Sequence, residues 1–140
     1  MISQELAREL KVAQLPWRPR RGDLVMDRLN VPYLVVRDGT DDAGGVEVDT
    51  GGGVERKPFL GLTWVPRVDQ LLDLLARHGP FDVAVRSAGE GRRDSEWVVT
   101  LTPAGEAAPR TFRSTNAGQA AGLALHHVLS ECGWRPGRAA

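Results

Sequence analysis

The sequence predicts an α+β fold in which helices pack on antiparallel strands. Near the end of the chain, Ser114 to Gly133 has the spacing of apolar residues that an α-helix needs. Before it, residues 81–113 contain short segments in which apolar and polar residues alternate, as in half-buried strands. Residues 24–65 contain further short β-forming segments, separated by glycine-rich breaks.

The predicted C-terminal helix has a start signal and a stop signal. Asn116 is suited to the N-cap, and Gln119 follows at the spacing of a capping box. Gly133 suits the left-handed position after the last turn. We expect the small residues of one face to lie close against a sheet. That face contains Ala117, Ala121, Ala124, Leu125, Val128 and Cys132.

The other elements follow the same logic. Ser3 is expected to cap a first helix that Pro16 stops, and Pro66 to begin a second one, with Asp73 and Arg77 as an i,i+4 ion pair. An N-terminal helix and a small β-rich segment, over residues 1–65, then precede an α-β-β-β-α unit over 66–140. The two halves could share one core. The expected strands of the first half, which suit a curled or barrel-like sheet, are Leu24–Met26, Tyr33–Val36, Val46–Val48 and Phe59–Val65.

Composition and charge set limits on function. The formal net charge is +0, so no general field draws the protein to nucleic acid or to an anionic membrane. One cysteine excludes an internal disulfide and a cysteine-based zinc site. No apolar run reaches the roughly 18 residues of a membrane span, so we expect no membrane association and a cytoplasmic location.

The sequence contains no recognisable catalytic or cofactor motif. His126 and His127 are adjacent, so on a helix their side chains diverge by about 100° and do not suit a single metal ion. Cys132 lies on the apolar face without a nearby base. The acidic residues near Asp41 do not have the spacing of a calcium loop. We therefore expect no enzyme activity, no metal and no cofactor.

Tryptophans beside arginines are the more suggestive feature. Trp and Arg dominate binding hot spots, so an exposed tryptophan next to arginines would be a natural anchor for a partner protein. The alternative for the first tryptophan is a position in the core, with the surrounding link only a solvated connector. The candidate protein-binding residues are Trp17, Arg18, Arg20, Arg21, Trp134 and Arg135.

From Pro66 to Gly133, about half the chain, the predicted order of helix, three strands and helix resembles the double-stranded-RNA-binding domain. Ala117 to Leu125 is similar to the alanine-rich last helix of that family. The resemblance implies duplex RNA binding, although Ser114 to Gln119 lacks the lysine cluster that the family carries there. Nucleic-acid binding is therefore the alternative function, through Arg92, Arg93, Arg110 and Arg113.

The run from Trp64 to Leu72, with the strand-hairpin-helix ending, is similar to small uncharacterised bacteriophage proteins. This second resemblance implies a phage or prophage origin. It favours a protein that modulates a host factor by binding it, so the expected partner is a host protein.

Overall fold

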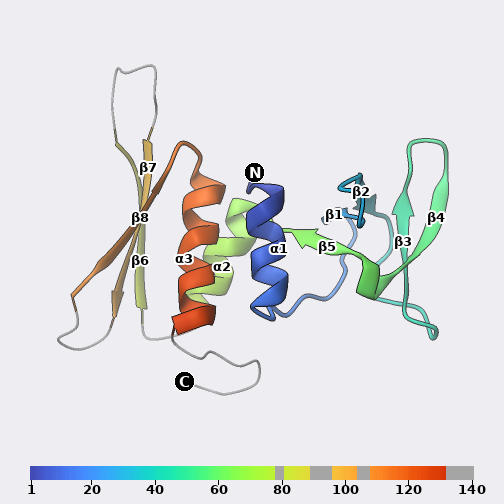
Figure 1. Cartoon of the computed structure of the whole chain (residues 1–140), viewed down its shortest axis with the longest axis horizontal. Helices are drawn as coiled ribbons and strands as arrows, with labels where there is room; N and C mark the ends of the chain where they lie inside the picture. Colours follow the sequence, from blue (N-terminus) through green and yellow to red (C-terminus); the bar gives the residue numbers. More distant parts are fainter. Residues whose placement is uncertain (78–80, 89–95, 104–107, 132–140) are drawn as a thin grey trace. The chain divides into compact units, whose positions relative to one another are not determined.

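The computed structural model describes residues 1–77, 81–88, 96–103 and 108–131. It confirms the α+β class, with three helices and two antiparallel sheets in the described residues (Figure 1). The chain divides into two compact units. The first consists of Met1–Gln14 with Arg67–Ala140, and the second of Leu15–Pro66. The sequence analysis grouped the N-terminal helix with the strands that follow it, whereas the contacts place it with the C-terminal elements.

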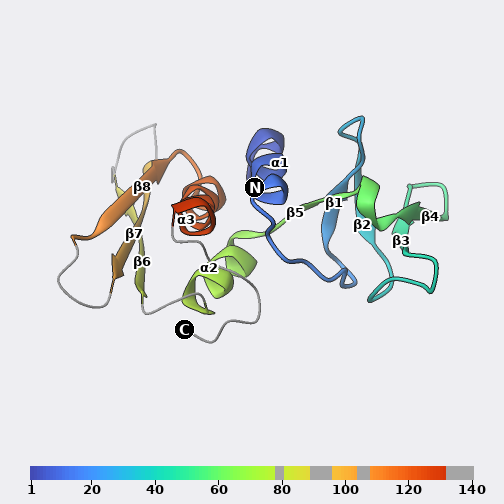
Figure 2. The ribbon, with the colours of Figure 1, turned by 60° about the horizontal axis from the view of Figure 1, so that its bottom comes forward.

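In the first unit, a three-stranded antiparallel sheet has its helices on one face (Figures 1 and 2). The strand order is β6-β7-β8, so β7 is central. The elements are α1 Gln4–Val12, α2 Val68–Arg77, β6 Phe81–Ala88, β7 Glu96–Pro103, β8 Arg110–Ser114 and α3 Ala117–Glu131.

Helix α3 lies at the centre of this unit, because it contacts β7 and β8 as well as α1 and α2. Ala121, Leu125 and Val128 are fully or almost fully buried, as the apolar periodicity predicts. Ala120 and Leu129 are buried too, which a helix covered on more than one side requires. Cys132, expected on the inward face, and Gly133, expected after the last turn, lie outside the described residues.

The start of α3 is tied to the start of the chain. Asn116 caps the helix by accepting from the Gln119 amide at 2.6 Å, as predicted. The Gln119 side chain does not complete a capping box; its oxygen accepts from the Ser3 amide at 2.8 Å. Asn116 Nδ2 also donates to the Met1 carbonyl at 3.1 Å, and Ser3 caps α1 by accepting from the Leu6 amide. These bonds fix α1 against the first turn of α3.

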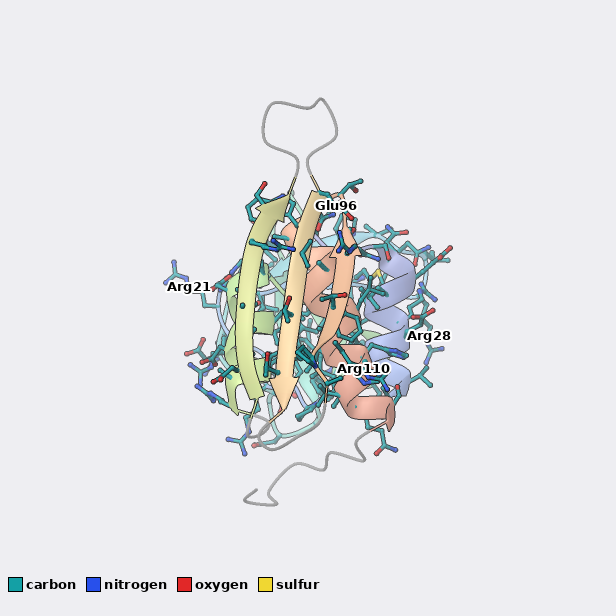
Figure 3. The ribbon with its side chains drawn as sticks, turned by 90° about the vertical axis from the view of Figure 1, so that its left-hand side faces the viewer. Arg21, Arg28, Glu96 and Arg110 are labelled. Atoms are coloured by element: carbon teal, nitrogen blue, oxygen red, sulfur yellow. The ribbon has the colours of Figure 1, made fainter. Side chains whose placement is uncertain are left out.

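The strand register separates the sheet into a helix-facing side and an open side. Val85, Val99 and Phe112 are partners across the three strands, and the Phe112 ring lies 5.5 Å from the His127 ring of α3. Because side chains alternate along a strand, the neighbouring positions face the other way. Arg86, Val98 and Arg113 form one such row on the open side, which Figure 3 shows without a covering helix; both arginines are exposed, whereas Val98 between them is buried.

The second unit is a five-stranded antiparallel sheet in the order β4-β3-β2-β1-β5, in which β1 to β4 form a meander and β5 pairs with β1. Val25, Val35, Val46, Val48 and Leu62 form its core on one face. Trp17, Tyr33 and Phe59 pack against that core. The elements are β1 Leu24–Met26, β2 Pro32–Val35, β3 Gly45–Asp49, β4 Val54–Pro58, the 3-10 turn η1 Phe59–Gly61 and β5 Thr63–Val65.

Two sequence-based expectations for this part of the chain were wrong. Strand β4 was missed because Glu55, Arg56 and Lys57 interrupt any apolar alternation; a strand at the edge of a sheet can carry such charges. The single strand expected over Phe59–Val65 is instead η1 followed by the short β5, since the chain must turn after β4 to pair β5 with β1 at the opposite edge of the sheet. In the first unit, a smaller difference concerns helix α1, which ends at Val12, before Pro16, because Gln14 adopts a left-handed conformation with φ of 64°.

Candidate protein-interaction site

Trp17 is held in an aromatic stack in the second unit. Its ring lies 5.2 Å from that of Phe59, with an interplanar angle of 21°. The Trp17 ring also stacks with that of Trp64, with ring centroids 6.0 Å apart and an interplanar angle of 9°. Trp17 is partly buried, so it packs against the core, which is the second of the two positions that the sequence analysis considered.

Asp23 joins this stack to the backbone of the following turn. Its side chain is 3% exposed, and Oδ2 accepts from the indole Nε1 of Trp17 at 3.0 Å and from the Arg20 amide at 2.9 Å. The Asp23 amide donates back to the Arg20 carbonyl at 3.0 Å. A buried carboxylate needs such donors, because an unsatisfied one is costly to remove from water. The result is a closed turn between Trp17 and Asp23.

The same turn is attached to strand β2 and the loop after it. The Gly39 amide donates to the Pro19 carbonyl at 2.7 Å, and the Arg21 amide donates to Asp38 Oδ1 at 2.7 Å. Pro19 is buried. At Gly22, φ is 91°, a conformation that favours glycine, and its amide donates to the Val35 carbonyl at 2.8 Å. The backbone of residues 17–23, the arginine segment, is therefore fixed from both sides.

The arginine segment exposes its basic side chains. Arg18, Arg20 and Arg21 are all exposed, between positions that are anchored inward. Figure 3 labels Arg21, whose side chain extends away from the ribbon into open space. The structure thus brings together four of the six residues predicted for protein binding, with the tryptophan as support and the arginines at the surface. Trp134 and Arg135 lie outside the described residues.

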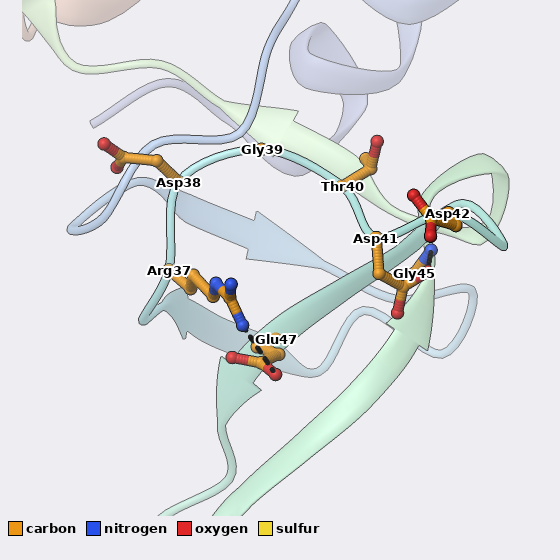
Figure 4. A pocket seen from close by; sticks show the side chains of 8 residues that line it. All are labelled: Arg37, Asp38, Gly39, Thr40, Asp41, Asp42, Gly45 and Glu47. Carbon is orange, nitrogen blue, oxygen red and sulfur yellow. Dashed lines mark hydrogen bonds and ion pairs between the residues drawn. The ribbon is translucent and has the colours of Figure 1, made fainter.

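A polar pocket of about 310 Å³ lies beside the arginine segment, and Asp38, which accepts from the Arg21 amide, is one of the residues that line it (Figure 4). Arg37 and Glu47 approach each other across it at 3.9 Å, a weak exposed pair. The pocket is lined by Arg37, Asp38, Gly39, Thr40, Asp41, Asp42, Gly45 and Glu47.

The Asp41 carboxylate holds the loop that lines this pocket, and its oxygens are already engaged in hydrogen bonds within the chain. Its Oδ1 accepts from the amides of Ala43 and Gly45 at 3.0 and 2.8 Å and from Arg56 Nη2 at 2.9 Å. Arg56 Nε also bonds to Oδ2. The hydrogen bonds from Arg56, followed by that from Gly45, hold the pKa of the Asp41 carboxyl well below its ordinary 3.8. Among the described residues, no group of three His, Cys, Asp or Glu side chains could hold a metal ion.

A second charged cluster, which the sequence analysis did not single out, joins β2, β4 and the β1–β2 turn. The Tyr33 hydroxyl donates to Asp27 Oδ2 at 3.0 Å, and Lys57 Nζ lies 5.0 Å from the Tyr33 ring centroid. Asp27 Oδ1 accepts from the amides of Leu29 and Val31. The bond from Val31 is the largest cause that lowers the pKa of Asp27. The bond to Asp27 raises the pKa of Tyr33 above 10.0.

The residues predicted for nucleic-acid binding are not gathered into one surface in the described part of the chain. Arg110 is the partner of Leu101 and Arg113 of Val98, so on strand β8 they point to opposite sides of the sheet. Arg113 is also 3.4 Å from Glu96. Arg92 and Arg93 lie in a stretch that the structure does not describe.

The two histidines have separate environments. His127 lies against Phe112, whereas His126 Nε2 is 3.5 Å from Ser130 Oγ. Cys132 lies beyond the last described residue, so a contact with either histidine is not tested. The absence of enzyme activity stays a prediction from the sequence.

Comparison with known proteins adds no further constraint. The chain matches no protein-family model, no curated protein and no solved structure at a significant level. Within the described ranges, no helix is long and apolar enough to cross a membrane.

Proposed function

We propose that this protein is a non-enzymatic protein-interaction module that uses the arginine segment to bind an acidic surface of a partner protein. The observation that carries the proposal is the fixed backbone of residues 17–23, from which three exposed arginines project. The resemblance to phage proteins suggests a host factor as the partner and modulation of that factor as the role.

Fixing the backbone before binding favours recognition. A loop that orders only on binding loses conformational entropy at that moment, whereas the turn between Trp17 and Asp23 is already closed. Guanidinium groups then offer planar, bidentate hydrogen bonds to carboxylates. Trp17 supports the turn from within, so we assign the direct contacts to Arg18, Arg20 and Arg21.

The test compares proteins captured from a lysate of the source organism, or of its host if the gene is of phage origin. The bait variant Arg18→Ala/Arg20→Ala/Arg21→Ala should lose a partner that the wild-type chain retains. Arg67→Ala/Arg77→Ala/Arg110→Ala removes the same charge from exposed positions of the first unit and should retain it. The recovered protein should then bind the purified wild-type chain directly, with affinity that falls as salt rises. A partner lost equally with both variants, or with neither, would contradict the assignment.

Nucleic-acid binding remains the second candidate, because the observed order of α2, three antiparallel strands and α3 is the one that the resemblance implies. Two features weigh against it: Arg110 and Arg113 diverge, and the first turn of α3 is engaged by Met1 and Ser3. A gel shift at low salt with duplex RNA of about 16 base pairs is decisive. A shift that Arg110→Ala/Arg113→Ala weakens, and the arginine-segment variant does not, would favour this candidate.

A further inference from the structure

Strand β6 ends the three-stranded sheet, and its outer edge pairs with no other strand in the described part of the chain. The strand runs for eight residues, and its middle contains Val83, Ala84 and Val85. Ala84 is exposed, and Val85 remains 37% exposed although it points to the helix side. A long apolar edge of this kind is a template for another strand.

The other edges lack these properties. Strand β4 exposes Glu55 and Arg56 and ends in Pro58, which has no amide hydrogen to donate. Charges and proline are the features by which edges avoid further pairing. Strand β8 has five residues, with Arg110 and Arg113 among them, and the edge strand β5 has only three residues. Among the described edges, β6 is therefore the one best suited to accept a strand.

The charges of β6 specify which strand it would accept. Asp82, Ala84 and Arg86 alternate onto the open side of the sheet, while Val83 and Val85 point to the helix side. If two copies of β6 pair antiparallel about Ala84, each Asp82 stands opposite Arg86 of the other copy. Each Val83 then stands opposite a Val85. The strand is thus complementary to itself in both charge and apolar content.

This register is also stereochemically allowed. Pairing about a single residue matches even positions with even ones and odd with odd, so outward-pointing backbone groups meet outward-pointing groups. The two-fold axis runs perpendicular to the sheet, so the helices of both copies stay on the same side. Asp82 and Arg86 are both exposed, and neither forms an ion pair with another described side chain.

We propose that the chain forms a symmetric homodimer in which β6 pairs antiparallel with β6 of a second copy, centred on Ala84. The dimer contains a continuous six-stranded sheet with two Asp82–Arg86 pairs across the new interface. Such a contact is isologous, since the same patch serves both subunits, and so it closes at two copies. The proposed interface contains no residue of the arginine segment.

Sedimentation velocity of the full chain across the micromolar range tests the proposal by charge reversal and restoration. Wild type should show a concentration-dependent dimer. Arg86→Asp places two acidic pairs at the interface and should raise the dimer Kd by about tenfold or more. Asp82→Arg should do the same with basic pairs. The double variant Asp82→Arg/Arg86→Asp regenerates both opposite-charge pairs and should restore dimerisation.

Arg110→Asp changes the charge of the other edge of the same sheet equally and should leave the dimer intact. Deuterium exchange gives an independent readout, since the outward-pointing amides among residues 82–86, which do not bond to β7, should become protected as concentration rises. A chain that stays monomeric throughout, a dimer that Arg86→Asp leaves unchanged, or a double variant that is not restored would overturn the proposal. Dimer loss with Arg110→Asp alone would also overturn it, by placing the contact on β8.

Discussion

Leu6 of α1 lies so close to Gly122 of α3 that a Cβ atom built on the glycine would stand 2.7 Å from Leu6 Cδ2 and 3.1 Å from Ile2 Cγ2. Gly122 is therefore a packing residue within a helix. Leu6 and Ile2 are each 2% exposed, so they have little room to move away. The missing side chain lets α1 lie against α3, beside the hydrogen bonds that join Ser3 and Gln119.

We predict that Gly122→Ala destabilises the protein, although alanine favours a helix by roughly 0.5–1 kcal/mol over glycine. The added methyl group must displace buried side chains, and overpacking of this kind costs about 1–3 kcal/mol. In a Leu6→Ala background the 2.7 Å contact is gone and Ile2 can move into the vacated space, so the same change should become stabilising. Urea unfolding of the four proteins in this cycle measures the reversal of sign.

Gly118 is the matched control, because the nearest atom that a Cβ there would meet is Asn116 Oδ1 at 3.4 Å, an ordinary contact distance. Gly118→Ala should raise the free energy of unfolding, because it gains the helix preference of alanine over glycine without any overpacking. An equal effect of alanine at both glycines would mean that α1 does not pack as closely as the structure shows.

Asp23→Ala should destabilise the second unit, because it leaves the Trp17 indole and the Arg20 amide without their acceptor. Leaving buried donors unsatisfied costs about 1–3 kcal/mol. Asp23→Asn retains an oxygen that can accept and should cost less. Tryptophan fluorescence during urea unfolding reports the change. Arg18→Ala, in the same segment but exposed, should leave the unfolding midpoint almost unchanged, which separates support of the turn from contact with a partner.

Because Asp41 is bonded to Arg56 in the folded chain, we expect the protein to lose stability in acid. Its pKa is lower in the folded chain than its ordinary 3.8, chiefly because Arg56 donates hydrogen bonds to it, so folding favours the carboxylate. This stabilisation is present above pH 3.8 and is lost as the pH falls through the lower folded-state pKa. Asp41→Asn should be less stable at neutral pH and lose less stability on acidification. Asp42→Asn removes the same charge from the same loop without removing the Arg56 contacts, so the two variants should differ.

The sequence was most informative where periodicity was strong. Ala121, Leu125 and Val128 in α3 are buried as their spacing predicted. Strand β1 was placed at its observed bounds, and strands β6, β7 and β8 lie where residues 81–113 alternate between apolar and polar. These signals depend only on residues close together in the sequence, so they can be interpreted without knowledge of the tertiary structure.

The candidate site was predictable only in part. The cluster of Trp17 with three arginines was visible in the sequence, but the bonds that fix it come from Asp38 and Gly39, about 20 positions further along. Only the β2 pairing brings those residues to the segment. The complementary charges of Asp82 and Arg86 were present in the sequence as well. These charges indicate a pairing surface only once β6 is known to be an edge strand. Strand periodicity alone does not show which strands lie at an edge.

Tyr33 offers a direct spectroscopic test, because it is the single tyrosine of the chain. Its hydroxyl donates to Asp27, and ionisation would both lose this bond and place two negative charges together, so its pKa lies above 10.0. Alkaline titration of phenolate absorbance should therefore give a raised midpoint. Asp27→Asn should lower the pKa towards 10.0, because it removes the negative charge beside the phenolate.

Lys57→Met should act in the opposite direction and raise the pKa of Tyr33 further, since the ammonium group near the ring favours the phenolate. Circular dichroism at each pH must show that the chain remains folded, because unfolding would return the tyrosine to its ordinary value. Equal and unshifted midpoints in wild type and both variants, in chains that stay folded, would show that the contacts of Asp27 and Lys57 with this ring are absent in solution.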